Sequence, residues 1–150
     1  MDPEREQEIL RRRLLGQGLA CRPVSSVDLG RDLELIAGPH GFDLRRVSGL
    51  DNLGQALEIA LTTLLDSDVF NTEFGFDGLN ALATETDPIL LRERVRIAVI
   101  QALRRDSRVR RIVDVKLGDG RLEAPAGGSR ELDVKVVFET VTADQSTIKL

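Results

Sequence analysis

The chain has 150 residues, of which 41% are hydrophobic and 31% are charged, and its formal net charge is −4. This balance is typical of a globular domain with a sizeable core and excludes a disordered chain. Five Phe with no Trp or Tyr predict an aliphatic core and argue against sites that stack sugars or single-stranded nucleic acid.

One cysteine and one histidine limit the chemistry that the chain can carry. Cys21 has no second cysteine for an internal disulfide, and His40 is the only histidine that could act as its base. A catalytic thiol needs a base and an orienting group, and a Cys/His zinc site needs four ligands. We therefore predict no catalytic residue, no metal and no cofactor.

Targeting signals are also missing from the sequence. No stretch reaches the ~18–20 apolar residues that cross a bilayer. Residues 1–4 are acidic and lack the basic start and apolar middle of a signal peptide. We expect synthesis in the cytoplasm and no association with a membrane.

Residues 3–15 are predicted to form a short, highly charged helix that begins with Pro3, which suits the first helical position. Its narrow apolar stripe consists of Ile9, Leu10 and Leu14. Residues 17–32 have no clear period, so we interpret them as a linker. This divides the chain into an N-terminal helix and linker, residues 1–30, and one domain, residues 31–150.

A hairpin and three helices are predicted next. Residues 32–36 and 42–47 have the pattern of two short strands around a glycine-rich turn at 38–41. Ser48 or Asp51 caps a helix whose leucines recur at three- and four-residue intervals. Two further helices are expected at residues 77–83 and from Asp87-Pro88, where Asp is the cap and Pro the first helical residue.

The C-terminal part changes to the period of β-strands. One strand is predicted to place these side chains on one face: Arg111, Val113, Val115 and Leu117. A Gly-, Pro- and Ala-rich connection, residues 118–129, leads to a second strand at 131–141, and residues 146–150 form a last strand or a tail. The predicted fold is α+β, with helices packed on one side of a small antiparallel sheet.

Charge is separated along the sequence. Residues 66–87 hold six acidic residues and no Lys or Arg, whereas residues 92–116 hold nine basic residues and three acidic ones. The two blocks either pair inside the fold or form complementary patches for a partner, where charge sets register. Nucleic-acid binding is disfavoured because the basic block lacks interleaved aromatic side chains and the whole chain is acidic.

Several short motifs follow one another in residues 33–150. They are Gln55-Ala56-Leu57, Thr62-Thr63, Phe74-Gly75, Ala102-Leu103, Asp106-Ser107-Arg108 and Ile112-Val113-Asp114-Val115. Their order resembles the GPW, or baseplate-wedge, family of contractile phage tails and related injection machines. The family has Glu-Pro-Arg at 106–108, so this chain keeps the acid and the Arg and loses the Pro. This chain also has Asp66-Ser67-Asp68 where the family often has Gly-Glu-Arg.

The resemblance implies a structural subunit that is built into the baseplate after synthesis, in six copies around the tail tube. The Glu-Pro-Arg region would contact other wedge proteins, and the sheath protein would be bound by strand addition. The wedge-binding residues would be Asp106, Ser107 and Arg108. We place strand addition at residues 131–141 and 146–150, with these sheath-binding positions: Leu132, Val134, Val136, Phe138 and Ile148.

Physical chemistry allows two roles for Arg108 and two other functions for the chain. Arg108 suits a two-pronged bond to a partner's carboxylate, with Asp106 orienting it, and an internal salt bridge is the alternative. A generic interaction adaptor is one other function. A peptidoglycan hydrolase is the second, because some members of the family that the chain resembles have carried a lysozyme label. Such an enzyme needs two carboxylates about 5–10 Å apart across a cleft. The candidate pairs are Glu73 with Asp77 and Glu85 with Asp87.

Overall fold

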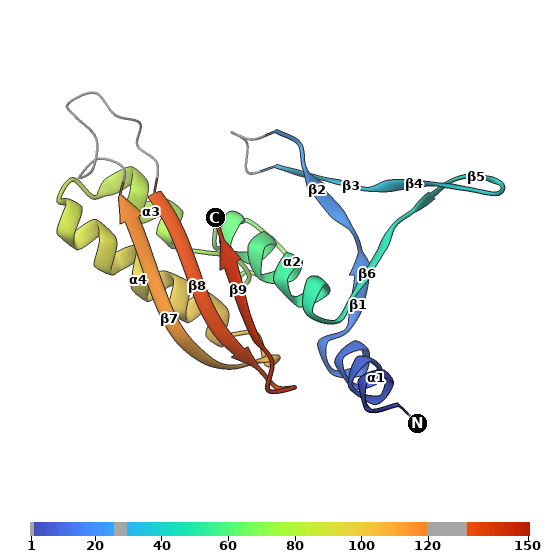
Figure 1. Ribbon diagram of the computed structural model, residues 1–150. Helices are drawn as coiled ribbons and strands as arrows, with labels where there is room; N and C mark the ends of the chain where they lie inside the picture. Colours follow the sequence, from blue (N-terminus) through green and yellow to red (C-terminus); the bar gives the residue numbers. More distant parts are fainter. Residues whose placement is uncertain (1, 26–29, 120–131) are drawn as a thin grey trace. The chain divides into compact units, whose positions relative to one another are not determined.

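The computed structural model describes residues 2–25, 30–119 and 132–150 and has the predicted α+β architecture (Figure 1). Two compact units are present, Met1–Ala56 and Leu57–Leu150. The division lies inside helix α2 (Gly49–Thr62) rather than after residue 30. The predicted boundary was wrong because part of the supposed linker is β-structure paired with residues 31–48.

Helix α1 (Pro3–Leu15) starts where the sequence predicts. Pro3 is at its first position, and the side chain of Asp2 accepts a hydrogen bond from the Glu4 amide at 3.3 Å. Gly16, with φ of 79°, ends the helix. Only Leu15 is buried in this helix, so α1 exposes its narrow apolar stripe.

Six short strands follow α1 and pair as three antiparallel ribbons. Their bounds are β1 (Gln17–Leu19), β2 (Cys21–Pro23), β3 (Arg31–Leu33), β4 (Leu35–Gly38), β5 (Gly41–Leu44) and β6 (Arg46–Ser48). The ribbons are β1–β6, β2–β3 and β4–β5 (Figure 1). The predicted hairpin is confirmed as β4–β5. Each of the two predicted strands is nevertheless split, because the half farther from the hairpin turn pairs with a strand from the supposed linker.

The three ribbons meet at a ring of main-chain hydrogen bonds, which we call the three-way junction. The Ala20 amide donates to the Arg45 carbonyl at 2.8 Å, the Arg45 amide to the Glu34 carbonyl at 2.9 Å, and the Glu34 amide to the Ala20 carbonyl at 2.9 Å. Arg45 Nη1 also lies 2.7 Å from Glu34 Oε1. Each ribbon is therefore held by the other two.

The first half of α2 is bound to the ribbons through amide side chains. Gln55 donates from Nε2 to the Leu19 carbonyl at 2.8 Å and accepts from the Cys21 amide at 2.7 Å. Asn52 donates from Nδ2 to the Leu15 carbonyl at 2.9 Å. The Gln of the Gln-Ala-Leu motif therefore has a structural role, since it joins the helix to both sides of the junction residue Ala20.

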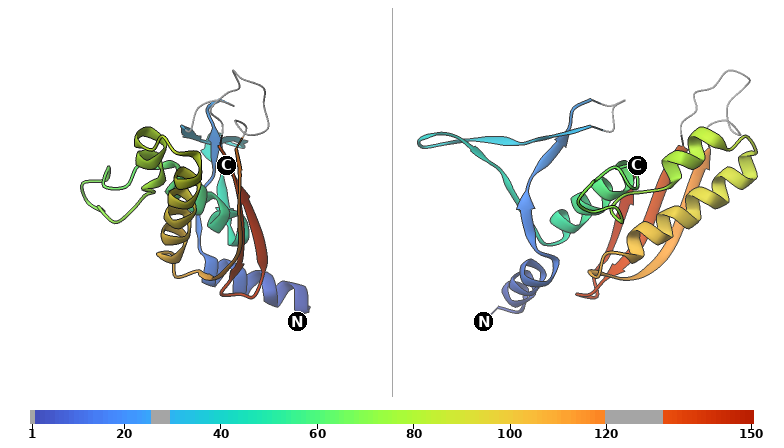
Figure 2. Two further views of the ribbon diagram at one scale, coloured as in Figure 1. Left: turned by 90° about the vertical axis from the view of Figure 1, so that its left-hand side faces the viewer. Right: turned by 180° about the vertical axis from the view of Figure 1, so that it is seen from behind.

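The C-terminal unit packs helices against one three-stranded sheet. It contains α3 (Gly78–Thr84), α4 (Pro88–Arg104), β7 (Val109–Asp119), β8 (Leu132–Thr140) and β9 (Gln145–Lys149). The sheet is antiparallel with the order β7-β8-β9, and α4 lies along one of its faces (Figure 2). Side chains buried in this unit include Val95, Val99 and Leu103 of α4 and Val115, Val136, Phe138 and Ile148 of the sheet.

The start of α4 and the faces of β8 agree with prediction, and the start of β7 does not. Asp87 accepts hydrogen bonds from the amides of Ile89 and Leu90, as an N-cap does. The β7–β8 register shifts between Ile112 and Asp114, so Val113 is an extra residue and is exposed. The predicted common face for residues 111–117 is therefore wrong before this bulge. Most of the predicted connection, from residue 120 onward, lies outside the described residues.

Candidate assembly interface

Asp106 and Arg108 form a two-pronged ion pair at the junction between α4 and β7. Asp106 Oδ1 accepts from the main-chain amide of Arg108 at 3.0 Å and from its Nε at 2.9 Å. Asp106 Oδ2 accepts from Arg108 Nη2 at 2.6 Å. The Arg108 carbonyl accepts from the Val141 amide at 3.0 Å, which ties the turn to the end of β8. The internal salt bridge, which the sequence left as the alternative role of Arg108, is therefore present. Ser107 beside it is exposed.

The pair is partly sheltered, and this affects its protonation. The side chains of Asp106 and Arg108 are 19% and 26% exposed. Burial alone would raise the pKa of Asp106, but the side-chain and main-chain hydrogen bonds from Arg108 and its charge outweigh burial and lower that pKa. The bond to Asp106 raises the pKa of Arg108 against the effect of burial. Both groups are therefore held charged, and the guanidinium is held in a fixed orientation.

Strand β8 is not a free edge, which corrects the prediction for residues 131–141. It lies in the middle of the sheet and is paired with β7 on one side and β9 on the other. Of the predicted sheath-binding positions, Leu132 lies in this central strand. The others have buried side chains: Val134, Val136, Phe138 and Ile148. Within the described residues of this three-stranded sheet, the outer strands are β7 and β9, and each leaves one edge open.

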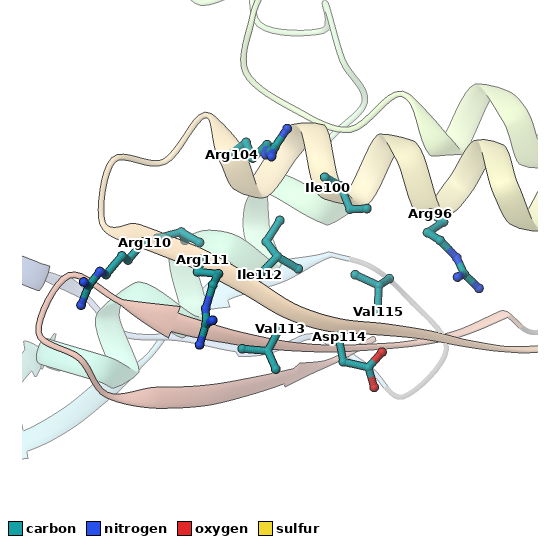
Figure 3. A pocket seen from close by; sticks show the side chains of 10 residues that line it. Arg96, Ile100, Arg104, Arg110, Arg111, Ile112, Val113, Asp114 and Val115 are labelled. Atoms are coloured by element: carbon teal, nitrogen blue, oxygen red, sulfur yellow. The ribbon is translucent and has the colours of Figure 1, made fainter.

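A groove runs between α4 and the open edge of β7 and has a volume of about 430 Å³ (Figure 3). Its charged lining consists of Arg96, Arg104, Arg110, Arg111 and Asp114, and its apolar lining of Ile100, Val109, Ile112, Val113 and Val115. Arg110 and Arg111 both lie within 3.3 Å of one carboxylate, that of Glu139. We call this surface the arginine groove. Sequence reasoning had noted only a basic block here.

Residues 65–76, between α2 and α3, form an ordered loop, which we call the acidic loop. Its base is closed by hydrogen bonds from the Leu65 amide to the Phe76 carbonyl at 3.3 Å and from the Phe76 amide to the Thr63 carbonyl at 2.8 Å. Asp68 Oδ1 accepts from the Phe70 amide at 2.9 Å and fixes the tip. Gly75 has φ of 113°, and a Cβ there would lie 2.8 Å from the Leu64 carbonyl oxygen, which explains the glycine of the Phe-Gly motif.

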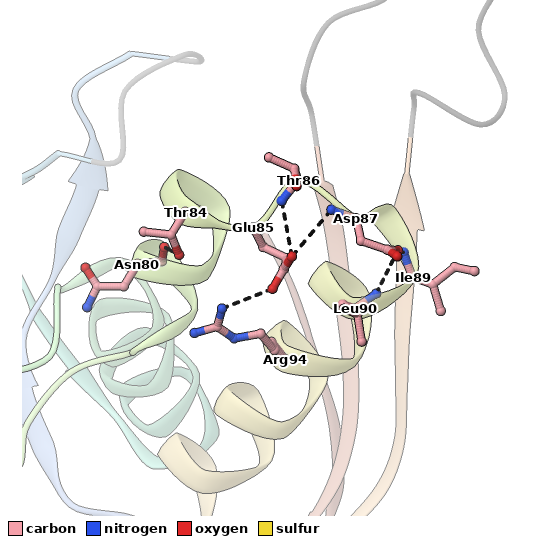
Figure 4. Close-up of polar contacts among 8 residues, drawn as sticks. All are labelled: Asn80, Thr84, Glu85, Thr86, Asp87, Ile89, Leu90 and Arg94. Carbon is pink, nitrogen blue, oxygen red and sulfur yellow. Dashed lines mark hydrogen bonds and ion pairs between the residues drawn. The ribbon is translucent and has the colours of Figure 1, made fainter.

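Part of the acidic block pairs with the basic block inside the fold. Glu85 lies 3.2 Å from Arg94 and also accepts from the amides of Thr86 and Asp87 (Figure 4). Arg105 Nη1 donates to the Glu73 carbonyl at 2.7 Å. Internal pairing, one of the two predicted alternatives, therefore holds for Glu85 and Arg94, whereas Arg105 binds the main chain of the acidic block. The acidic loop itself stays exposed.

Three of the four carboxylates proposed for a hydrolase have local structural contacts. Asp87 caps α4 and Glu85 pairs with Arg94. Asp77 accepts from Asn80 Nδ2 at 3.0 Å, within the first turn of α3. None of these carboxylates lines the arginine groove. Within the described residues, no group of three or more His, Cys, Asp or Glu side chains is placed to hold a metal ion.

No protein-family model matches the sequence, and no curated protein matches it significantly. None of the helices in the described ranges combines the length and the apolar character needed to cross a membrane. The geometry of the C-terminal unit therefore supplies the physical argument for function. Its main features are the Asp106–Arg108 pair, two open strand edges, the arginine groove and the acidic loop.

Proposed function

We propose that this chain is a structural baseplate wedge subunit of a contractile tail or injection machine. It links the wedge to the sheath protein and starts sheath assembly by strand addition. The observation that carries this proposal is the small antiparallel sheet of the C-terminal unit, whose outer strands each leave one edge open among the described residues. Open edges offer main-chain donors and acceptors to an extended segment of another protein. Such a role needs no catalytic residue or cofactor.

Strand β9 is the better of the two edges for strand addition. Strand β7 is interrupted by register shifts near Arg111 and Asp114, and bulges of this kind disturb regular pairing. Strand β9 pairs with β8 without a shift from Gln145 to Lys149. It is only five residues long and ends in a lysine, which are features that protect an exposed edge from aggregation. Residues 146–150 therefore stay in the proposal, and residues 131–141 leave it.

The Asp106–Arg108 pair supports the proposed contact with other wedge proteins. Asp106 holds the planar guanidinium in one orientation, so binding a partner's carboxylate or helix-end carbonyl costs little further ordering. Ser107, exposed at the same turn, adds a hydroxyl to this surface. The wedge-binding residues in the proposal are therefore Asp106, Ser107 and Arg108.

A pull-down from the native producing cells tests both parts of the proposal. Tagged wild-type chain should recover sheath and wedge proteins, and Arg108→Ala should recover about tenfold less wedge protein, as expected for a hot-spot arginine. Arg94→Ala is the matched control, since it removes an arginine that pairs with Glu85 at a distance from the turn. Equal loss in both variants, or recovery of nucleic acid or unrelated proteins alone, would contradict the proposal.

An interaction adaptor remains the second candidate, and one ribbon of the N-terminal unit favours it. The register of β4–β5 places Leu35 opposite Leu44 and Ala37 opposite Phe42, so that one face of this ribbon is wholly apolar. Phe42 on that face is 80% exposed. Fractionation separates the two functions, because a baseplate subunit sediments with sheathed particles whereas an adaptor stays in the soluble pool.

A further inference from the structure

The tip of the acidic loop presents apolar side chains that acidic residues flank along the sequence. Val69 is 86% exposed and Phe70 is 100% exposed. Asp66, Asp68 and Glu73 flank them, and the loop contains no Lys or Arg. The Asp68 turn and the closed base hold the tip in place, so little conformational entropy is lost when it is buried. A fully exposed aromatic side chain on a hydrogen-bonded turn has the properties of a binding anchor.

The arginine groove has the complementary composition. Its floor offers apolar contact through Ile100 of α4 and Ile112 of β7, which point toward each other (Figure 3). Its charged lining residues and their ion-pair partners comprise five cations and three carboxylates: Arg96, Arg104, Arg110, Arg111, Lys116, Glu93, Asp114 and Glu139. Arg104 makes no ion pair with a carboxylate of the described chain. Its volume of about 430 Å³ lies within the range of pockets that bind small organic ligands.

We propose that copies of this chain bind one another head to tail, with the acidic loop of one copy seated in the arginine groove of the next. Phe70 and Val69 contact the apolar floor, and the loop carboxylates face Arg104 and its neighbours. Charge complementarity of this kind sets orientation and register. The occupant of the groove is therefore a second copy, whose loop supplies both the apolar tip and the opposite charge.

The positions of loop and groove make this contact heterologous. The groove lies between α4 and β7 (Figure 3), whereas the loop extends from the side of α4 that faces away from the sheet (Figure 2). Each copy therefore offers a loop to one neighbour and a groove to another. A head-to-tail contact closes into a ring when its rotation divides a full turn.

Sedimentation of the purified full chain tests this contact without any baseplate protein, so the result is independent of the proposed function. Wild-type chain should self-associate as its concentration rises toward about 1 mM, and added salt should weaken the association. Phe70→Asp should weaken it at least about tenfold. Ile89→Asp, which changes another exposed apolar residue in the first turn of α4 and outside the groove lining, should leave it unchanged. A chain that stays monomeric throughout, or equal effects of the two substitutions, overturns the proposal.

A mixing experiment tests the head-to-tail arrangement itself. Phe70→Asp removes the apolar anchor of the loop and leaves the groove intact. Arg104→Glu reverses a charge in the groove and leaves the loop intact. Each variant alone should be monomeric, and an equal mixture should form a one-to-one dimer that does not grow further. Both side chains are exposed, so both variants should fold. Circular dichroism checks that they do. Continued association of either variant alone, or no dimer in the mixture, would contradict a loop-in-groove contact.

Discussion

Asp106 and Arg108 are separated by one residue, and the structure joins them through both carboxylate oxygens. The sequence predicted this internal bond as one of two roles, because an acid and an arginine at this spacing can meet across a turn. It also predicted that Asp106 orients Arg108. Contact with a partner cannot be tested in one chain, because the surface that would bind the guanidinium belongs to the partner. That role therefore stays a prediction.

The lowered pKa of Asp106 predicts a pH-dependent contribution to stability. A carboxyl group whose folded-state pKa lies below its unfolded value of about 3.9 stabilises the fold above that value, and the contribution disappears as the pH falls through the folded-state pKa. Asp106→Asn should therefore cost about 1–3 kcal/mol near neutral pH, as for hydrogen bonds to charged groups. Thermal melts should show the difference from wild type shrinking as the pH falls from about 5 toward 2.

Asp114→Asn serves as the comparison for this measurement. Asp114 is exposed and lies 3.6 Å from Lys116, and surface pairs of this kind contribute only about 0–1 kcal/mol. Its substitution should change the melting temperature little at any pH. A difference between Asp106→Asn and wild type that is constant across the pH range would show that the charge of Asp106 does not stabilise the fold.

Gly75 is predicted to tolerate no side chain. Its φ of 113° lies in a region that other residues rarely adopt, and a Cβ would press on the Leu64 main chain. Gly75→Ala should cost at least about 1–3 kcal/mol in unfolding experiments. Gly54→Ala is the matched substitution, because a Cβ at Gly54 in α2 meets nothing within 4 Å and alanine favours a helix by about 1 kcal/mol. Similar melting temperatures for the two variants would refute this account.

Helix starts were predicted well because their signals are local. Asp2-Pro3 and Asp87-Pro88 each place a cap and a first helical residue side by side, and both helices begin there. The strands β1 and β2 were missed because three residues are too few to show a period. Their partners are also distant in sequence, as in the pair Gln17 and Ser48. Pairing over such separations leaves no signal in a short window.

The order of strands in the sheet was also beyond local patterns. Alternation predicted correctly which β8 side chains are buried, because Val134, Val136 and Phe138 lie two residues apart. It says nothing about whether a strand lies at the middle or the edge of a sheet. For the same reason the bulge at Val113 was missed, since an extra residue is defined only by its partner strand.

Strand β9 offers a specific test of strand addition. Val134 and Leu150 exchange both main-chain hydrogen bonds, and alternation from this pair turns the amide of Thr147 away from β8 and toward the open edge. Thr147→Pro removes that outward donor and keeps the β8–β9 bonds, so the fold should stay stable while recovery of sheath protein in a pull-down is lost. Ser146→Pro removes a bond to β8 and should destabilise the sheet. Full sheath recovery with Thr147→Pro would exclude β9 as the template.

The separation of charge along the sequence has two outcomes in the fold. Glu85, just after α3, pairs with Arg94 of α4. The sequence allowed this internal pairing but did not distinguish it from pairing with a partner. The acidic loop and the arginine groove remain on the surface, so the charge that is left over is available to partners. Composition predicted that such patches exist. Only the three-dimensional arrangement showed that one carries an exposed Phe70 and the other an apolar floor.

The three-way junction also has a consequence for how this chain can vary over evolution. The ring of Ala20, Glu34 and Arg45 fixes where the ribbons start, whereas the tip of β4–β5 at Pro39-His40 lies at the far end of its ladder. Insertion of one or two residue pairs at that tip lengthens the ribbon and preserves the face of every side chain behind it, because those residues keep their existing register. The ribbon β4–β5 can therefore vary in length while the main-chain hydrogen bonds of the three-way junction stay unchanged.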